Sequence, residues 1–165
     1  MILLGSGASR IRGDLPAWST GYHDYDICGS KDEFESLVSY FGGRSEGILG
    51  LWINDMGNGR HAIRKGLKDR ILVDWVMDDT PAYQALQKLP MALVVTELGH
   101  SMQVITAETD LVARLAYQHL PIRRENNDAW ITHLQETVGE IEWTADLRSF
   151  HDHLRDEVTT AFSGS

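Results

Sequence analysis

The sequence predicts an α+β fold, with a small mixed β-sheet and flanking helices followed by a helical C-terminal part. Short apolar runs that end in glycine or polar residues are typical of strands, and they fill the first two thirds of the chain. In the last third, apolar residues recur every three or four positions, which is the period of amphipathic helices. We therefore expect a core over residues 1–105 and a helical part over 106–165. No Pro/Gly-rich linker separates them, so we expect one compact unit.

The core is expected to alternate strands with short helices. Ser30 and Glu33 have the spacing of a capping box, so a helix should start there, and Thr80 followed by Pro81 indicates a second helix start. The other elements, in chain order, are a strand at 1–4, helical turns at 7–12, a loop at 13–22, a strand at 24–28, a hairpin from GILGLWIND and MGNGRHAI, a strand at RILVDWVM, and strands or extended segments at MALVVTEL and SMQVIT.

The last third is expected to hold three helices. Two cover about 107–119 and 125–138, and Thr144 caps the third. One apolar stripe runs along that final helix, and we interpret it as a packing surface: Trp143, Leu147, Phe150, Leu154, Val158 and Phe162.

Composition limits the class of partner. The 165 residues carry 15 Lys and Arg against 24 Asp and Glu, a formal charge of −9, which argues against generic DNA binding because that requires a basic surface. Cys28 is the single cysteine, so no intrachain disulfide can form. No apolar stretch approaches the roughly 18 residues of a membrane helix, and MILL is too short for a signal peptide. We expect a cytoplasmic protein that does not bind membranes.

Three aspartates are the candidate chemical groups. Asp24 and Asp26 are two residues apart on an expected strand, so their side chains share one face. Asp74 interrupts the apolar run ILVDWV, where a buried charge would need a partner. If that strand lies beside the 24–28 strand, the three carboxylates form a cluster suited to Mg²⁺ or Mn²⁺. A chance D-x-D in a turn, or an Asp74 paired with an arginine or a backbone amide, is the structural alternative.

The opening stretch LLGSGASR supplies a candidate phosphate site. Gly5 and Ser6 end a strand and begin a helix, where free backbone N–H groups and the helix dipole attract anions. Arg10 lies about one turn further on and is expected to reach the same phosphates, and Arg12 is a weaker candidate.

In order and in type, these motifs resemble those of the DNA polymerase β-like nucleotidyltransferase superfamily. LLGSGASR, HDYDI and LVDWV are similar to its three motifs, and the chain also resembles small phage and bacterial nucleotidyltransferase-like proteins, in which ETDLVARLAYQHLPI would be a further shared helix. The resemblance implies that Gly5 and Ser6 bind the terminal phosphates of an NTP. It also implies that Asp24, Asp26 and Asp74 hold Mg²⁺ or Mn²⁺, and that Asp74 helps to deprotonate the acceptor.

That resemblance leads us to expect transfer of NMP from an NTP to a hydroxyl or phosphate, with release of pyrophosphate, in bacterial or phage-infected host cytosol. The acceptor stays open and could be tRNA, a protein or a small molecule. One alternative is a non-catalytic module on the same fold that binds nucleotide or a host protein. A phosphohydrolase is a third, with less support, because Gly-Ser stands where the aspartyl nucleophile of such enzymes is expected.

The remaining polar motifs carry weaker expectations. His23 precedes Asp24 and is either a loop residue or a group near the phosphates. Cys28 is expected to be a small buried residue rather than a reactive thiol. A short basic run ahead of the Asp74 strand either faces a nucleotide or is a solvated sheet edge: Lys65, Lys68 and Arg70.

Overall fold

The computed structural model describes residues 1–19, 24–42, 51–57, 59–65 and 71–163. The chain forms two compact units. The first contains Met1–Leu15, Thr20–Asp78 and Leu93–Val104, and the second contains Pro16–Ser19, Asp79–Ala92 and Ile105–Ser165. The second unit thus takes in the 79–92 segment, which the sequence analysis had assigned to the core. Among the described residues, no helix has the length and apolar character needed to cross a membrane.

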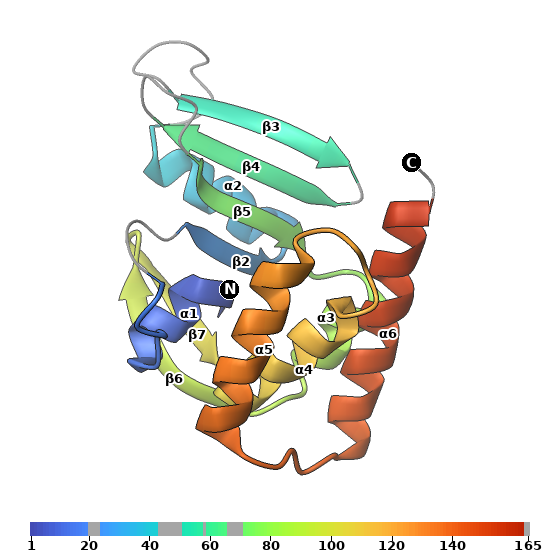
Figure 1. Cartoon of the computed structure of the whole chain (residues 1–165). Coiled ribbons are helices and arrows are strands. Elements are labelled where there is room, and N and C mark those ends of the chain that lie inside the picture. Colours follow the sequence, from blue (N-terminus) through green and yellow to red (C-terminus); the bar gives the residue numbers. More distant parts are fainter. Residues whose placement is uncertain (20–23, 43–50, 58, 66–70, 164–165) are drawn as a thin grey trace. The chain divides into compact units, whose positions relative to one another are not determined.

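The predicted fold class is confirmed: the protein has a mixed, seven-stranded sheet with helices (Figure 1). The strand order is β3-β4-β5-β2-β1-β7-β6. β1 runs antiparallel to β2 and parallel to β7, and β2 runs parallel to β5. The strands are β1 (Ile2–Leu4), β2 (Tyr25–Gly29), β3 (Leu51–Gly57), β4 (Arg60–Lys65), β5 (Ile71–Met77), β6 (Met91–Glu97) and β7 (His100–Ile105).

Six helices are present in the described part of the chain, and most begin where the sequence predicts. Ser30 and Glu33 form the predicted capping box, and Thr144 Oγ accepts from Leu147 N at 3.2 Å. Thr80 is the N-cap of its helix and Pro81 follows as the first helical residue, as predicted, although the Thr80 hydroxyl makes no side-chain cap bond. The helices are α1 (Gly5–Arg12), α2 (Lys31–Tyr40), α3 (Pro81–Leu86), α4 (Ala107–Tyr117), α5 (Arg124–Val138) and α6 (Ala145–Ser163).

In the first unit, α2 packs on one face of the sheet. The Phe34 ring lies 5.4 Å from the Trp75 ring and 4.8 Å from the His61 ring, measured between centroids. His61 and Trp75 are register partners on β4 and β5, and Ile27 of β2 is the next partner of Trp75. Because side chains alternate along a strand, the residues that flank these positions belong to the opposite face. Asp26 and Asp74 are among them.

In the second unit, α6 packs against α3 and α4. The predicted apolar stripe is buried along its middle and exposed at its ends, where Trp143 and Phe162 keep 40% and 43% of their surface accessible. The buried part of the stripe is Leu147, Phe150, Leu154 and Val158.

Candidate functional site

Asp26 and Asp74 are direct neighbours in the sheet. β2 and β5 pair in parallel with Asp26 opposite Asp74, so the two side chains leave the sheet on the same face. Asp24 lies one residue before β2, outside the strand, so strand alternation does not fix the face of its side chain. The predicted carboxylate cluster depended on these two strands being adjacent, and the strand pairing confirms that adjacency. The cluster's role stays a prediction.

The burial of Asp74 differs from the expectation. Val73 and Trp75, on either side of it, are 0% and 1% exposed, whereas the Asp74 residue itself is exposed. The run ILVDWV therefore is not buried on both faces. Asp74 is an accessible carboxylate rather than a charge enclosed by apolar side chains, while Asp24 and Asp26 are half-buried.

The Gly-Ser corner lies against Asp26. Leu4 of β1 is the register partner of Asp26, and α1 begins at the next residue, Gly5, with a φ of 61°. A Cβ at Gly5 would collide with Oδ2 of Asp26 and lie 3.3 Å from its Cγ. Glycine is thus required twice here, for its backbone conformation and for the space that the Asp26 carboxylate occupies.

Gly7 is a second close approach, which the sequence analysis did not identify. A Cβ at Gly7 would lie 3.3 Å from the backbone oxygen of Asp24 and 3.9 Å from Cα of Tyr25. The spacing Gly5-x-Gly7 therefore lets the first turn of α1 rest on the start of β2. The small residues of GSG are the sequence signal from which this contact could have been inferred.

The N-terminus of α1 has little to neutralise it within its own helix. Leu4 at the N-cap offers no side-chain acceptor, and no acidic residue lies in the first turn. Ser6, the second residue of α1, is half-buried. The partial positive charge of the helix N-terminus therefore lies beside the Asp26 carboxylate. Binding of phosphate at this helix end stays a prediction.

The described residues contain no group of three or more His, Cys, Asp or Glu side chains that could hold a metal ion. Asp24, Asp26 and Asp74 are thus not a preformed cage. Their oxygen atoms are nevertheless of the class that Mg²⁺ prefers, and Mg²⁺ is commonly held by one or two carboxylates together with substrate phosphates. The residues fit an ion that arrives with a nucleotide, and metal binding stays a prediction.

Arg10 contacts an aromatic ring. Its Cζ lies 5.9 Å from the centroid of Tyr25, whose hydroxyl donates to Glu97 Oε2 at 2.8 Å. Burial, followed by the hydrogen bond to Glu97, raises the pKa of Tyr25. By alternation, Tyr25 leaves β2 on the face opposite to Asp26. To contact a phosphate beside Asp26, the exposed Arg10 side chain would have to leave the Tyr25 ring. The contact of Arg10 with phosphate stays a prediction.

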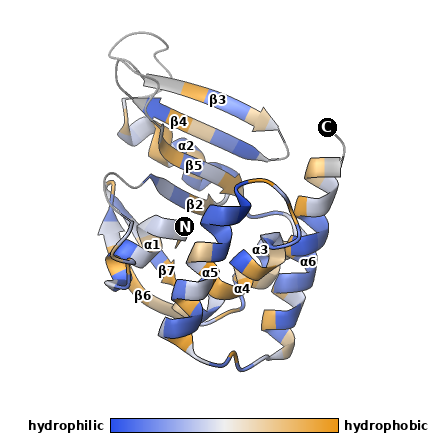
Figure 2. Cartoon of the chain, viewed as in Figure 1, coloured by the Kyte–Doolittle hydropathy of each residue, from blue (hydrophilic) through white to orange (hydrophobic). Residues whose placement is uncertain are grey.

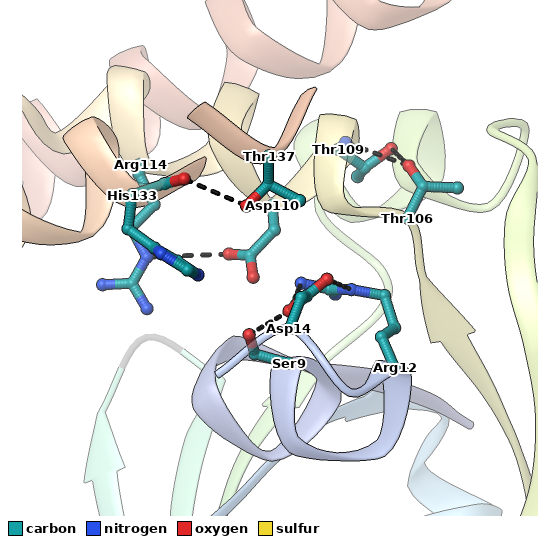
Figure 3. Close-up of polar contacts among 9 residues, drawn as sticks. All are labelled: Ser9, Arg12, Asp14, Thr106, Thr109, Asp110, Arg114, His133 and Thr137. Carbon is teal, nitrogen blue, oxygen red and sulfur yellow. Dashed lines mark hydrogen bonds and ion pairs between the residues drawn. The ribbon is translucent and has the colours of Figure 1, made fainter. Parts of the chain in front are cut away.

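Arg12 is held by its own segment. Arg12 Nε donates to Asp14 Oδ2 at 2.8 Å and its Nη2 donates to Asp14 Oδ1 at 3.1 Å. The buried Ser9 hydroxyl also donates to Asp14 Oδ1 (Figure 3). This network closes the end of α1 and gives Arg12 a structural role, in place of the weaker phosphate role suggested above.

Cys28 is buried, as predicted. It is 1% exposed, and burial, with Asp78 as the next cause, raises the pKa of the thiol to about 12. The thiol therefore stays protonated at neutral pH and is a packing group.

The second unit holds a buried carboxylate that the sequence analysis did not single out. Asp110 on α4 is 2% exposed, and its Oδ1 lies 3.6 Å from Arg114 Nε, one helical turn on (Figure 3). The guanidinium of Arg114 lies 4.5 Å from the ring centroid of Trp130, and the Trp18 ring meets Trp130 edge-on at 5.4 Å. The Asp-x-x-x-Arg spacing in ETDLVARL is the sequence signal from which this ion pair could have been predicted.

His23, Lys68 and Arg70 lie outside the described residues, and so does Asn58 of the predicted Gly-Asn-Gly turn. Lys65 belongs to β4, but its side chain also lies outside them. Their predicted roles are untested.

Comparison with solved structures finds distant similarity. No family model matches the chain, and no curated protein matches it. The crystal structure of an antigenic nucleotidyltransferase-like protein from Paracoccidioides brasiliensis is similar over 98% of this chain and 82% of that one, with 14% sequence identity and a TM-score of 0.46. At that level of similarity, the comparison assigns neither a family nor an activity to this chain.

Proposed function

We propose that the protein is a metal-dependent nucleotidyltransferase that moves NMP from an NTP to a hydroxyl or phosphate acceptor. The observation that carries the proposal is the meeting of three separate sequence motifs: Asp26 and Asp74 are register partners, and the Gly5 backbone rests against the Asp26 carboxylate. A helix N-terminus that could bind phosphate, beside two carboxylates that could hold a metal ion, supports the proposal, because phosphoryl transfer is catalysed mostly by positioning and charge neutralisation.

In this proposal, different groups of the chain bind the phosphates, take the acceptor proton and hold the metal ion. Backbone N–H groups at Gly5 and Ser6 bind the terminal phosphates and hold the α-phosphorus in line with the acceptor. An acceptor oxygen forms a bond to that phosphorus while the bond to the bridging oxygen breaks, and pyrophosphate leaves. The acceptor proton passes to Asp74. Mg²⁺ or Mn²⁺ held by Asp24, Asp26 and Asp74 with the phosphates would supply neutralisation of the accumulating negative charge.

A labelled-nucleotide experiment tests this function. The wild type and an Asp24→Ala/Asp26→Ala variant are incubated with each labelled NTP, Mg²⁺ or Mn²⁺, and a crude cell extract. We expect pyrophosphate release and transfer of label with the wild type alone, and the labelled species identifies the acceptor. Release of inorganic phosphate instead of pyrophosphate would indicate a phosphohydrolase and contradict the proposal.

The second candidate is a non-catalytic nucleotide-binding or host-protein-binding module. The exposure of Asp74 and the lack of a preformed three-ligand group among the described residues favour it. NTP binding by the wild type, without pyrophosphate release or label transfer in the extract, would select this candidate over the enzyme.

A further inference from the structure

The two edges of the sheet differ in how they are protected. β3, at one edge, carries Asp55 and a register shift between Asp55 and Gly57, where the Asp55 side chain accepts from Gly57 N at 2.8 Å. A charge and a bulge are two of the devices by which proteins prevent an edge strand from pairing with another chain. The β3 edge is therefore protected against pairing with a strand of another chain.

β6, at the other edge, lacks these devices. Its sequence is MALVVTE, and Figure 2 shows the hydropathy of its residues along the strand. Its exposed apolar residues include Leu93, 37% accessible, and Val94, 62% accessible. Leu93 and Val94 leave the strand on opposite faces, so both faces are open at this point. The only charge, Glu97, stands at the end of the strand and accepts from Tyr25 rather than guarding the edge.

The exposure of the side chains differs sharply between β7 and β6, the two strands at this end of the sheet. Met102 and Val104 of β7 are both fully buried, whereas the middle of β6 is exposed. In the described part of the chain, β7 is the strand that neighbours β6, and the outer side of β6 has no neighbouring strand. That side presents a row of backbone N–H and C=O groups next to apolar side chains, which is a template for one more strand.

We propose that β6 pairs with β6 of a second copy of this chain, antiparallel about a two-fold axis, to form a dimer with a continuous sheet. The strand is complementary to itself. With the axis at Val94, Val94 faces Val94, Leu93 faces Val95, and Glu97 faces Met91, so no like charges are opposed. An isologous contact of this kind closes as a dimer instead of propagating into a fibre. The inference does not depend on the proposed function.

The chain offers a matched pair of variants for the test. Val94→Lys places a charge on the β6 edge, and Met56→Lys places the same charge on β3, at a residue that is 58% exposed. In the proposed dimer, the two introduced ammonium groups of Val94→Lys face each other across the axis, so we expect this variant to dimerise about tenfold more weakly, or worse. Met56→Lys should leave dimerisation unchanged. Sedimentation equilibrium over a range of protein concentrations measures both.

Three results would overturn the proposal: a wild type that is monomeric up to its highest soluble concentration, a Val94→Lys variant that dimerises as tightly as wild type, or an equal loss in both variants. Circular dichroism and thermal unfolding check that the variants fold. If Val94→Lys does not fold, amide hydrogen exchange of the wild type decides the matter. Protection of the β6 amides must then rise with protein concentration while that of the β3 amides does not.

Discussion

Asp26 and Asp110 are the same residue type in opposite surroundings. Asp26, in the first unit, lies half-buried beside another carboxylate, Asp74, and against the backbone of Gly5. Asp110, in the second unit, is 2% exposed and pairs with Arg114, which lies over the Trp130 ring. Two adjacent carboxylates repel each other, whereas a buried ion pair is held by its partner. The Asp26–Asp74 arrangement is suited to binding a cation, whereas the Asp110–Arg114 pair, with Arg114 over Trp130, is suited to holding α4 against α5.

The largest expected effect is on catalysis. Asp26→Asn and Asp74→Asn should each lower the rate of pyrophosphate release about 100- to 1,000-fold, because each removes a proposed ligand of the metal ion that would neutralise the reacting phosphates. The free energy of unfolding should stay within about 1.5 kcal/mol of wild type, since asparagine has nearly the shape of aspartate. Asp128→Asn, an exposed aspartate of α5, is the control and should retain full activity. A steady-state pyrophosphate assay measures the rates, and a Tm scan checks the fold.

The second prediction concerns stability. Two Asp–Arg pairs have the same one-turn spacing, but Asp110–Arg114 is largely buried and Arg124–Asp128 is exposed, at 3.6 and 3.9 Å. Asp110→Ala should lower the free energy of unfolding by about 3 kcal/mol, because it leaves a partly buried guanidinium without this partner. Asp128→Ala should lower it by about 0.5 kcal/mol or less. Urea unfolding measures both, and equal losses would contradict the contrast between the two environments.

A third prediction separates backbone conformation from contact at Gly5. Gly5 and Gly13 both have a positive φ, but a Cβ at Gly13 would meet nothing within 4 Å. Gly13→Ala should therefore cost about 1–2 kcal/mol from backbone strain alone. Gly5→Ala should cost about 1–3 kcal/mol more, because its Cβ would displace the Asp26 carboxylate. Titration calorimetry with NTP should find weaker binding in Gly5→Ala alone, and a loss in both would refute the role of the contact.

The smallest effect is expected at Cys28. Because burial raises the pKa of its thiol to about 12, the folded protein should resist alkylation by iodoacetamide at mildly alkaline pH and react once unfolded. The raised pKa also makes the free energy of unfolding fall as the pH rises from about 8.5, where the unfolded thiol ionises, towards 12. Cys28→Ala should remove that part of the pH dependence, and rapid alkylation of the native protein would show that the thiol is accessible.

Local patterns predicted the elements well, because their signals lie within a few residues. The Ser30 capping box and the strand that contains Asp26 are examples, and both depend on short-range geometry. The neighbouring positions of β2 and β5 were stated only as a condition, because no local signal fixes which strands pair across 40 or more residues of chain.

Other features of the site required the three-dimensional structure. Asp74 is exposed although both neighbours are buried, because its face of β5 is open at that position. Asp110 is buried although it is charged. The sequence could not predict this, because the apolar periodicity of α4 marks Leu111 and Val112 as buried but gives no information on the environment of Asp110 next to them. Periodicity locates the buried face of a helix, and it does not specify the partner of a charge on the edge of that face.

The most direct measurement is titration calorimetry of NTP with Mg²⁺ into the wild type, Asp26→Asn and Asp110→Asn, with the unfolding free energy determined on the same samples. The account predicts that wild type binds, that Asp26→Asn folds normally but loses binding, and that Asp110→Asn loses stability but binds while it is folded. A wild type that does not bind any NTP, or an Asp26→Asn variant that binds as tightly as wild type, would contradict the assignment of this site.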